Sequence, residues 1–205
     1  MLPFPQWEPS WRGGLSNSGR VISTANRGTL GHTAWYVFVN VEELLAAYAT
    51  GHREFHQLKL PQASLNCAEL QEASIVECDF YKSNLSDANL SNTIINRTNF
   101  RRVNLSGAVA THSILQDTTL NEADLSGTDF RNANLTDVDL SGADLINADF
   151  SGADLRGADL SGAVIIGTNF SQANLCNVKM DDVDMEDVTF ADTIMPDGQL
   201  RSSEG

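Results

Sequence analysis

The sequence is short of cysteine, of basic residues and of long apolar runs, and each shortage excludes a class of protein. Its three cysteines are an odd number, so a framework of paired disulfides is not expected, and free thiols fit a reducing compartment. No apolar run approaches the roughly 18 residues that a membrane-spanning helix needs. The first ten residues contain neither a basic start nor an apolar signal segment, so we expect a cytoplasmic protein.

Motifs that mark common catalytic and cofactor sites are also missing. The chain has no phosphate-binding glycine loop, no Cys-x-x-Cys pair and no His-Glu-x-x-His motif. His52 and His56 are four residues apart, but Gly51 ends the preceding helical pattern, so they need not share a face. Serines often follow apolar positions, yet no base is placed to activate them. We therefore expect no enzymatic activity, no metal site and no cofactor.

Positive charge is scarce and unevenly placed. The chain has 13 Lys and Arg against 27 Asp and Glu, a formal net charge of −14. Residues 1–54 hold four of each sign, so the excess negative charge lies in residues 55–205. Such an acidic surface repels nucleic acids and anionic membranes, so neither is expected as a direct partner. A basic protein surface is the kind of partner that it would attract.

What the sequence does contain is a strict period of five residues. Every fifth residue from Phe55 to Met195 is apolar, and the residue two positions earlier is nearly always small. Residues 143–162 illustrate the pattern with ADLIN ADFSG ADLRG ADLSG. Helices repeat every 3.6 residues and strands every 2, so neither explains this period. A short period kept over a long stretch indicates a solenoid.

Five residues can form one side of a square coil, an extended piece followed by a turn. Four sides would close a coil after about 20 residues, with the apolar centre and the small residue pointing inward. The second residue after each centre is often Gly or Asn, which suits the positive φ of a type II turn. Where it is Arg, Glu or Asp, we expect other turn types. Two stacks of Phe are predicted on opposite inner faces: Phe130, Phe150, Phe170 and Phe190 on one, and Phe80 and Phe100 on the other.

The repeated A(D/N)LXX pattern resembles the pentapeptide-repeat family, and its style is most similar to that of cyanobacterial members, some of which are regulatory. The resemblance covers residues 53–197. It implies an all-β solenoid, a right-handed quadrilateral β-helix of about seven coils, with a short N-terminal capping α-helix. At about 4.8 Å for each coil, the rod would be roughly 35 Å long.

The remaining segments flank this repeat. Residues 1–39 are predicted to be an irregular extension with a candidate strand at Trp35–Val39, or upstream sequence if the natural chain starts near Val39. Residues 40–52 are predicted to form the capping helix, with Asn40 as N-cap and Gly51 as C′ residue. Residues 198–205 are predicted to be a polar tail. Because the last coil is rich in Met, we expect a monomer, or a weak dimer through this C-terminal coil.

Two functions of different kinds fit these features. The first is a non-enzymatic scaffold for protein–protein interaction, because a rod offers regular faces whose outward positions vary freely. The second follows from the resemblance, since some family members imitate DNA and bind a type II topoisomerase, DNA gyrase. A net charge of −14 over roughly 35 Å is about one charge per 2.5 Å, against about one per 1.7 Å in duplex DNA. Those members carry projecting loops and a C-terminal dimerising helix that this sequence lacks, so the scaffold ranks first.

Outward apolar residues on adjacent coils are the candidate partner-binding residues. Ile146 and Ile166 follow a centre and are 20 residues apart, and Val164 occupies a slot on the same face where the pattern expects Asp or Asn. Ile94 and Ile114 stack likewise on the opposite face, each just before a centre. Adjacent apolar side chains in solvent form a patch, although β-branched residues also fill extended backbone without further purpose. We predict a partner-binding strip, with Ile146, Val164 and Ile166 as the better candidate.

Overall fold

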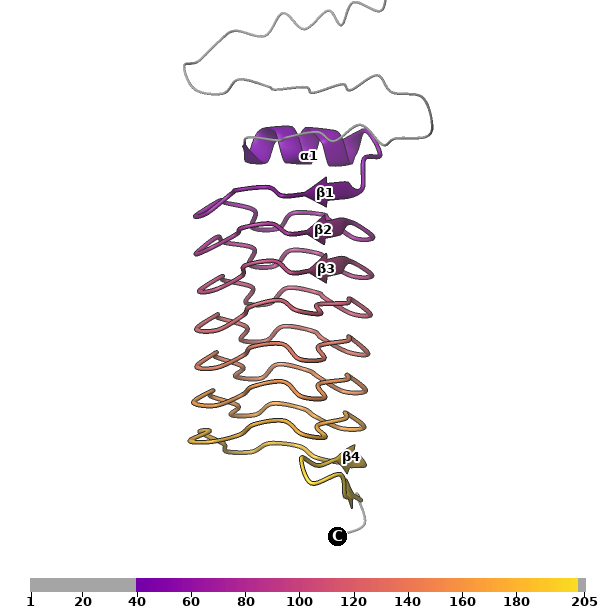
Figure 1. Ribbon diagram of the computed structural model, residues 1–205, viewed down its shortest axis with the longest axis vertical. Coiled ribbons are helices and arrows are strands. Elements are labelled where there is room, and N and C mark those ends of the chain that lie inside the picture. The colour runs from indigo at the N-terminus through magenta and orange to yellow at the C-terminus, as the bar shows by residue number, and fades with distance from the viewer. Residues whose placement is uncertain (1–39, 203–205) are drawn as a thin grey trace, which may run out of the picture.

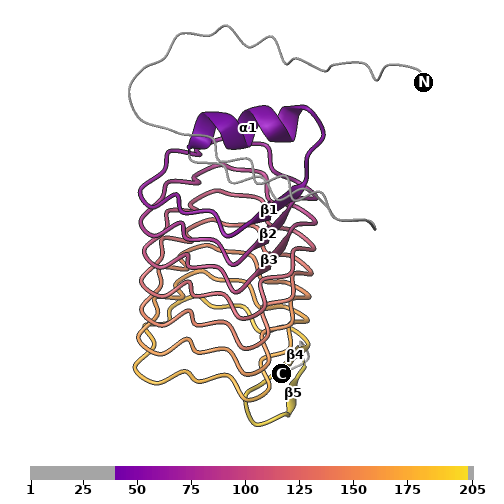
Figure 2. The same ribbon diagram turned by 45° about the horizontal axis from the view of Figure 1, so that its top comes forward.

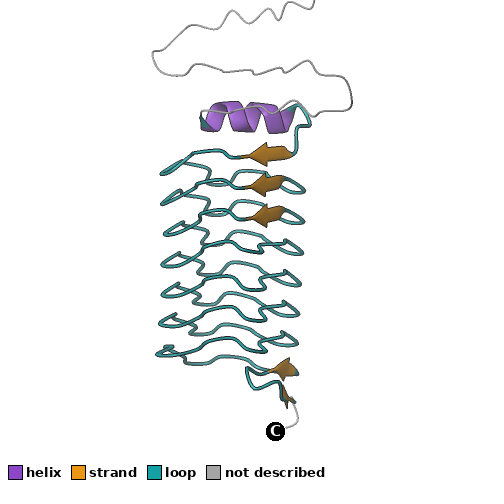
Figure 3. Ribbon diagram, viewed as in Figure 1, coloured by secondary structure: helices purple, strands orange, loops and turns teal. Residues whose placement is uncertain are grey.

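The computed structural model describes residues 40–202, and within them the chain is a stack of coils with one helix across its first end (Figure 1). The elements in chain order are α1 (Val41–Ala49), β1 (Glu54–His56), β2 (Ser74–Val76), β3 (Ile94–Asn96), β4 (Thr193–Ile194) and β5 (Leu200–Arg201). Most of each coil lies outside these short strands (Figure 3). The predicted extension of residues 1–39, with its candidate strand Trp35–Val39, lies outside the described residues.

Each coil is hydrogen-bonded to the next with a shift of 20 residues. Strands β1, β2 and β3 form a parallel sheet in which Phe55 lies opposite Ile75, and Ile75 lies opposite Ile95. Parallel bridges continue the same register from the pair Lys59 and Asp79 to the pair Asn174 and Ile194. Four sides of five residues therefore make one coil, which confirms the predicted quadrilateral β-helix.

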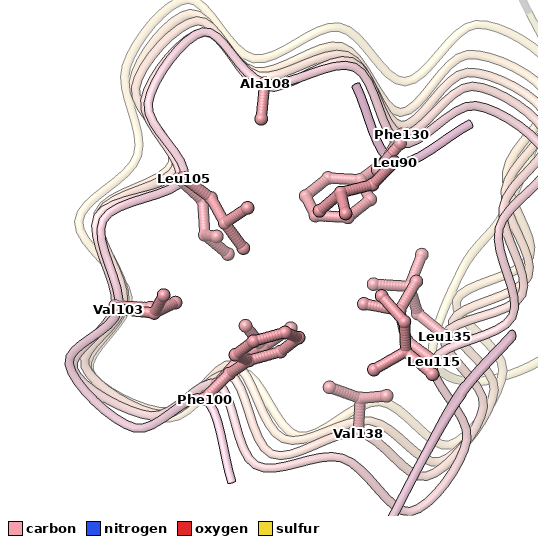
Figure 4. Close-up of a cluster of buried hydrophobic side chains, with 14 of the residues drawn as sticks. Leu90, Phe100, Val103, Leu105, Ala108, Leu115, Phe130, Leu135 and Val138 are labelled. Atoms are coloured by element: carbon pink, nitrogen blue, oxygen red, sulfur yellow. The ribbon is translucent and has the colours of Figure 1, made fainter. Parts of the chain in front are cut away.

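The interior is filled by one large side chain from each side and one small side chain near each corner. Figure 4 shows Phe100, Leu105, Leu115 and Phe130 pointing inward from four different sides. All four are at most 1% exposed. The predicted Phe stacks are confirmed, with ring centroids 5.4 Å apart for Phe80–Phe100, 5.0 Å for Phe130–Phe150, 5.3 Å for Phe150–Phe170 and 5.7 Å for Phe170–Phe190. Continuous contact between coils means that each coil is stabilised by its two neighbours.

Several of the small inward residues are Ser or Thr, and their hydroxyl groups donate to backbone carbonyls, mostly of the neighbouring coil. The Thr128 hydroxyl donates a hydrogen bond to the carbonyl of Leu105 at 2.8 Å, and the Thr168 hydroxyl donates to the carbonyl of Leu145 at 2.8 Å. A buried hydroxyl without a partner would cost free energy. These bonds explain why Ser and Thr substitute for Ala inside an otherwise apolar stack.

The corners share a positive φ whatever residue occupies them. The residue two after each centre has a positive φ at every corner from Gln57 to Asp192, including 50° at Arg97, 57° at Glu122 and 55° at Asp117. The prediction of other turn types is wrong at Glu122 and Asp117, where Ala123 and Thr118 donate to the carbonyls of Leu120 and Leu115 as in the glycine corners. At Glu77, Arg97 and Asp187 the corner is a bend instead, as the prediction allowed. The corner N–H donates to the carbonyl of the next coil, as from Glu122 to Ser141 at 2.9 Å. The closed coil and this bond impose the left-handed conformation against the residue's own preference.

Helix α1 lies over the first coil (Figure 2). Its N-cap is Asn40, whose Oδ1 accepts the backbone N–H of Glu43 at 2.9 Å, and Gly51 follows its end with a φ of 93°. Leu44 is only 1% exposed and belongs to the same apolar core as the coil centres. The Tyr48 hydroxyl donates to the carbonyl of Gln71 at 3.0 Å and ties the helix to the stack.

The other end of the stack finishes in a short hairpin. Strand β5 pairs antiparallel with β4, with Ile194 opposite Leu200. The turn between them is held by the N–H of Met195 donating to the carbonyl of Gln199 at 2.8 Å. Residues 198–205, predicted as a polar tail, therefore include a strand, and residues 203–205 lie outside the described residues.

Candidate interaction surface

The rod has four outer faces, which we name after one inward residue of each side: the Phe100, Leu105, Phe130 and Leu115 faces. The Phe100 face lies opposite the Phe130 face, and the Leu105 face lies opposite the Leu115 face (Figure 4). Residues of one face recur every 20 positions, because the coils pair with that shift. The outward positions of a face are those just before and just after each inward centre.

Outward Asp and Asn residues are bound into the turns that follow them. Oδ1 of Asp144 accepts the backbone N–H of Ile146 at 3.0 Å, and Oδ1 of Asp139 accepts that of Ser141 at 3.0 Å. The same bond recurs along the rod, while stacked residues such as Asp139 and Asp159 form columns. These carboxylates stabilise turns and make the surface acidic, which accounts for their abundance without an acid/base role.

Basic side chains on the Phe130 and Leu115 faces are paired locally. The Arg131 guanidinium donates to both carboxylate oxygens of Asp129, at 2.9 and 2.7 Å, and these bonds hold the pKa of Asp129 below its usual value. Arg156 lowers the pKa of Asp154 in the same way. Such side chains offer little unpaired positive charge to a partner.

Positive charge is concentrated on the first half of the Phe100 face and its corner. Arg101 and Arg102 both pair with Glu122, and hydrogen bonds from Arg101 and then from Arg102 lower the pKa of Glu122. Lys82 lies beside them, with its Nζ 5.4 Å from the centre of the Tyr81 ring. Within an acidic rod, this group is a local basic patch.

The predicted partner-binding residues lie on two opposite faces. Ile94 and Ile114 form a parallel bridge on the Leu115 face and are 42% and 36% exposed. Ile146, Val164 and Ile166 lie together on the Leu105 face but are half-buried. The two groups of residues therefore cannot form one patch. The exposed fractions favour Ile94 and Ile114 on the Leu115 face over Ile146, Val164 and Ile166, which were ranked first from the sequence.

Three further exposed apolar residues were not among the candidates named from the sequence. Val109 is 39% exposed on the Phe130 face, just before a centre, where the pattern expects Asp or Asn. Val164 is a candidate because an apolar residue replaces the expected Asp or Asn, and Val109 meets the same criterion. Met185, at 51%, and Leu200, at 65%, are exposed at the C-terminal end, where the last coil has no further coil to cover it.

The thiols and imidazoles form no site within residues 40–202. Cys67, Cys78 and Cys176 are free, as predicted, and burial raises the pKa of Cys78 to about 11. No group of His, Cys, Asp and Glu in this range could hold a metal ion. A shallow hollow at the corner beside the Leu115 face is lined by His56, Gln57, Val76, Glu77 and Arg97. Among the described residues, no helix has the length and apolarity to cross a membrane.

Comparisons with known proteins agree with the repeat. A family model described as pentapeptide repeats matches eight copies, over residues 83–121, 113–152 and 153–192. No curated protein matches the chain.

Three solved structures illustrate the similarity. HetL, a pentapeptide repeat protein involved in heterocyst differentiation regulation in the cyanobacterium Nostoc sp. strain PCC 7120, is 26% identical over 80% of this chain and 100% of its own, with a TM-score of 0.31. QnrB1, a plasmid-mediated fluoroquinolone resistance protein, is 19% identical over 66% of this chain and 82% of its own, with a TM-score of 0.48. A pentapeptide repeat protein of the Arabidopsis thaliana thylakoid lumen is 28% identical over 46% and 63%, with a TM-score of 0.36.

Proposed function

Because the chain belongs to the pentapeptide-repeat family and has its right-handed quadrilateral β-helix, we propose that it is a non-enzymatic scaffold that binds another protein. The rod presents flat faces on which outward residues change without disturbing the inward ones. Its free thiols fit a reducing cytoplasmic compartment. Its net charge of −14 would attract a partner with a basic surface.

The observation that supports this proposal most is the exposed pair Ile94 and Ile114. Both occupy slots that elsewhere hold Asp or Asn, and both leave more than a third of their surface in water. Ile94 is the first residue of β3, and Ile114 is bridged to it on the next coil. An apolar pair on a flat face, rimmed by polar residues, is the anatomy of a binding surface.

The double variant Ile94→Glu with Ile114→Glu should lose the partner while keeping the fold. Both side chains point to solvent, so the melting temperature should change little. Recovery of the partner from a native lysate should fall about tenfold or more, because about 1.4 kcal/mol of lost contact is already tenfold in affinity. The measurement is a quantitative pull-down with the purified full chain as bait.

Ile146→Glu with Ile166→Glu is the matched control on the Leu105 face. It makes the same substitution at two isoleucines 20 residues apart, on the opposite side of the rod. If only this second pair abolished recovery, the binding strip would be Ile146, Val164 and Ile166. If neither pair did, both apolar strips would be excluded.

The acidic columns favour a second candidate, imitation of DNA toward a type II topoisomerase. Stacked carboxylates such as Asp124 and Asp144, or Asp129 and Asp149, run along a straight rod. The basic patch on the Phe100 face interrupts this resemblance, since Arg101, Arg102 and Lys82 would repel a DNA-binding surface. The scaffold therefore remains the first proposal.

Purified protein at micromolar concentration should leave the supercoiling activity of DNA gyrase unchanged. The repeat register does not break between Phe55 and Met195, so the coils carry no inserted loop, and β5 rather than a helix follows the last coil. A gel assay of plasmid supercoiling measures the effect. Potent inhibition that weakens as salt is raised would place DNA mimicry above the scaffold.

A further inference from the structure

Charge on the Phe100 face is divided along the rod axis. The first half, toward α1, carries four exposed basic residues, Lys59, Lys82, Arg101 and Arg102, and two acidic residues, Asp79 and Glu122. The second half, toward β4, carries four acidic residues and one basic residue: Asp139, Asp159, Asp181, Asp182 and Lys179. A face of this kind can match itself when a second copy lies on it with its rod axis reversed.

The outward residues of the face form three straight columns. The residues just before each centre are bridged one coil apart, from Lys59 through Asp79, Asn99, Thr119, Asp139 and Asp159 to Lys179. The residues just after each centre and the corner residues keep the same spacing, since the N–H of Lys82 donates to the carbonyl of Arg101, and that of Arg102 to the carbonyl of Asn121. All three columns have the same spacing from coil to coil, so every coil of one copy can lie opposite a coil of the other.

Consider a two-fold axis that lies in the plane of contact and runs perpendicular to the two rods. It makes the second rod antiparallel to the first and places each column opposite the same column of the second copy. Placed midway between the coil levels of Thr119 and Asp139, this axis brings Asp79 opposite Lys179 and Lys82 opposite Asp182. Tyr81 then meets Asp181, Asn99 meets Asp159, and Thr119 meets Asp139, so each of these carboxylates faces a hydrogen-bond donor.

The other opposed residues in the three columns join a charged or polar side chain to an uncharged residue. They are Arg101 with Ser161, Asn121 with Ser141, Arg102 with Gly162, and Glu122 with Gly142. No like charges are opposed in these columns. Moving the axis to the level of Thr119 would oppose Lys59 to Lys179 and Asp79 to Asp159. Moving it to the level of Asp139 would bring Arg101 and Arg102 to Asp181 and Asp182 but oppose Asp139 to Asp139 of the second copy. Of these three registers, the midway one opposes no like charges in these columns.

From this pattern, we propose that the Phe100 face binds the same face of a second copy of the chain, antiparallel, about a two-fold axis midway between Thr119 and Asp139. Such an interface is isologous, so each charge pair occurs twice. It uses neither the exposed isoleucines of the Leu115 face nor the exposed Met185 and Leu200 at the C-terminal end. Because the axis runs across the rods, both Leu115 faces would point the same way and present two copies of Ile94 and Ile114.

Formation of this dimer requires an ion pair between Lys179 and Asp159, and a hydrogen bond between Asn99 and Asp79, to exchange partners. Lys179 pairs with Asp159 within one copy at 3.0 Å, and its side chain is 65% exposed, so it can turn to Asp79 of the second copy at little cost. The −14 net charge of each copy opposes association, although salt screens it beyond about 8 Å at physiological ionic strength. The expected dimer is reversible and dependent on concentration.

One corner opposes this register. At the edge shared with the Leu115 face, Asp117 of one copy would meet Asp137 of the other, and both are exposed. Their repulsion occurs twice, which also limits the affinity. Asp117→Asn should therefore strengthen association severalfold.

Sedimentation velocity of the full chain over a range of concentrations at physiological salt tests the proposal. The natural sequence should show a monomer–dimer equilibrium. Lys82→Glu and Asp182→Lys should each weaken association about tenfold or more, because each opposes two like charges twice. An equimolar mixture of these two variants should dimerise again, because the introduced carboxylate of one copy then meets the introduced ammonium group of the other, and the second pair is natural. The double variant should dimerise with itself for the same reason.

Controls separate this interface from other contacts. Arg156→Glu, which makes the same change of net charge as Lys82→Glu but on the Leu115 face, should leave association unchanged, and melting curves establish that every variant is folded. A natural chain that stays monomeric at all concentrations would overturn the proposal. So would a Lys82→Glu variant that associates as well as Arg156→Glu, or a loss of dimer on Met185→Glu alone, which would place the contact at the exposed apolar end beside Met185. Failure of the mixed variants to associate would reject the two-fold register.

Discussion

Leu145→Lys should unfold the middle of the coil stack and lower the melting temperature by roughly 10 °C or more. Leu145 is fully buried at the centre of a closed coil, where its neighbours on adjacent coils are Leu125 and Ile165. An ammonium group there has no partner and no path to water, and burial of an unpaired charge costs about 4 kcal/mol or more. For a domain of this length, 1 kcal/mol corresponds to about 2–4 °C. Circular dichroism during heating measures the change.

Gln116→Lys is the matched control for this variant. Gln116 is exposed just after a centre on the Leu115 face, so the same ammonium group stays in water. Its effect should be within about 0.5 kcal/mol. Equal losses of melting temperature for the two variants would contradict the inward assignment of every fifth residue.

Leu44→Asp should detach α1 from the first coil, lower the melting temperature and cause aggregation. Leu44 contacts the core and is 1% exposed, so burying a carboxylate there should cost about 3–5 kcal/mol. The first coil would then expose its apolar centre and the unpaired edge of β1, which can pair with other chains. Light scattering during heating measures aggregation, and circular dichroism measures the melting temperature.

Ala46→Asp places the same carboxylate on the exposed side of the same helix. Its cost should be limited to the poorer helix propensity of Asp, under about 1 kcal/mol. If Leu44→Asp behaved like Ala46→Asp, the helix would not act as the cap that we propose for residues 40–52.

The inward pattern could be predicted from the sequence because burial follows the period directly. Phe130, Phe150 and Phe170 are 20 residues apart and stack because four sides close one coil. The corner conformation could not be predicted at Arg97 or Glu122, since residue preference opposes a positive φ and only closure of the coil imposes it. Strand β5 could not be predicted either, because two paired residues carry no period.

The exposed fraction of each candidate partner-binding residue could not be predicted from the sequence either. Val164 and Ile114 occupy the same slot before a centre, yet Val164 is half-buried and Ile114 is exposed. Their column neighbours differ, since Val164 lies between Asp144 and Asp184 while Ile114 lies between Ile94 and Asn134. The slot thus predicts an outward direction, and the surrounding side chains decide how much surface remains in water.

The four-sided coil also governs how length changes in the gene would act on the protein. An insertion of five residues would preserve every inward position but rotate all later outward residues by a quarter turn onto the next face. Lys82 and Asp182 would then no longer lie in the same column if the insertion fell between them. An insertion of 20 residues would add one coil and leave every later residue on its own face, because the coils repeat at that interval. Surface patterns on this rod should therefore survive gains and losses of whole coils, and be scrambled by those of single repeats.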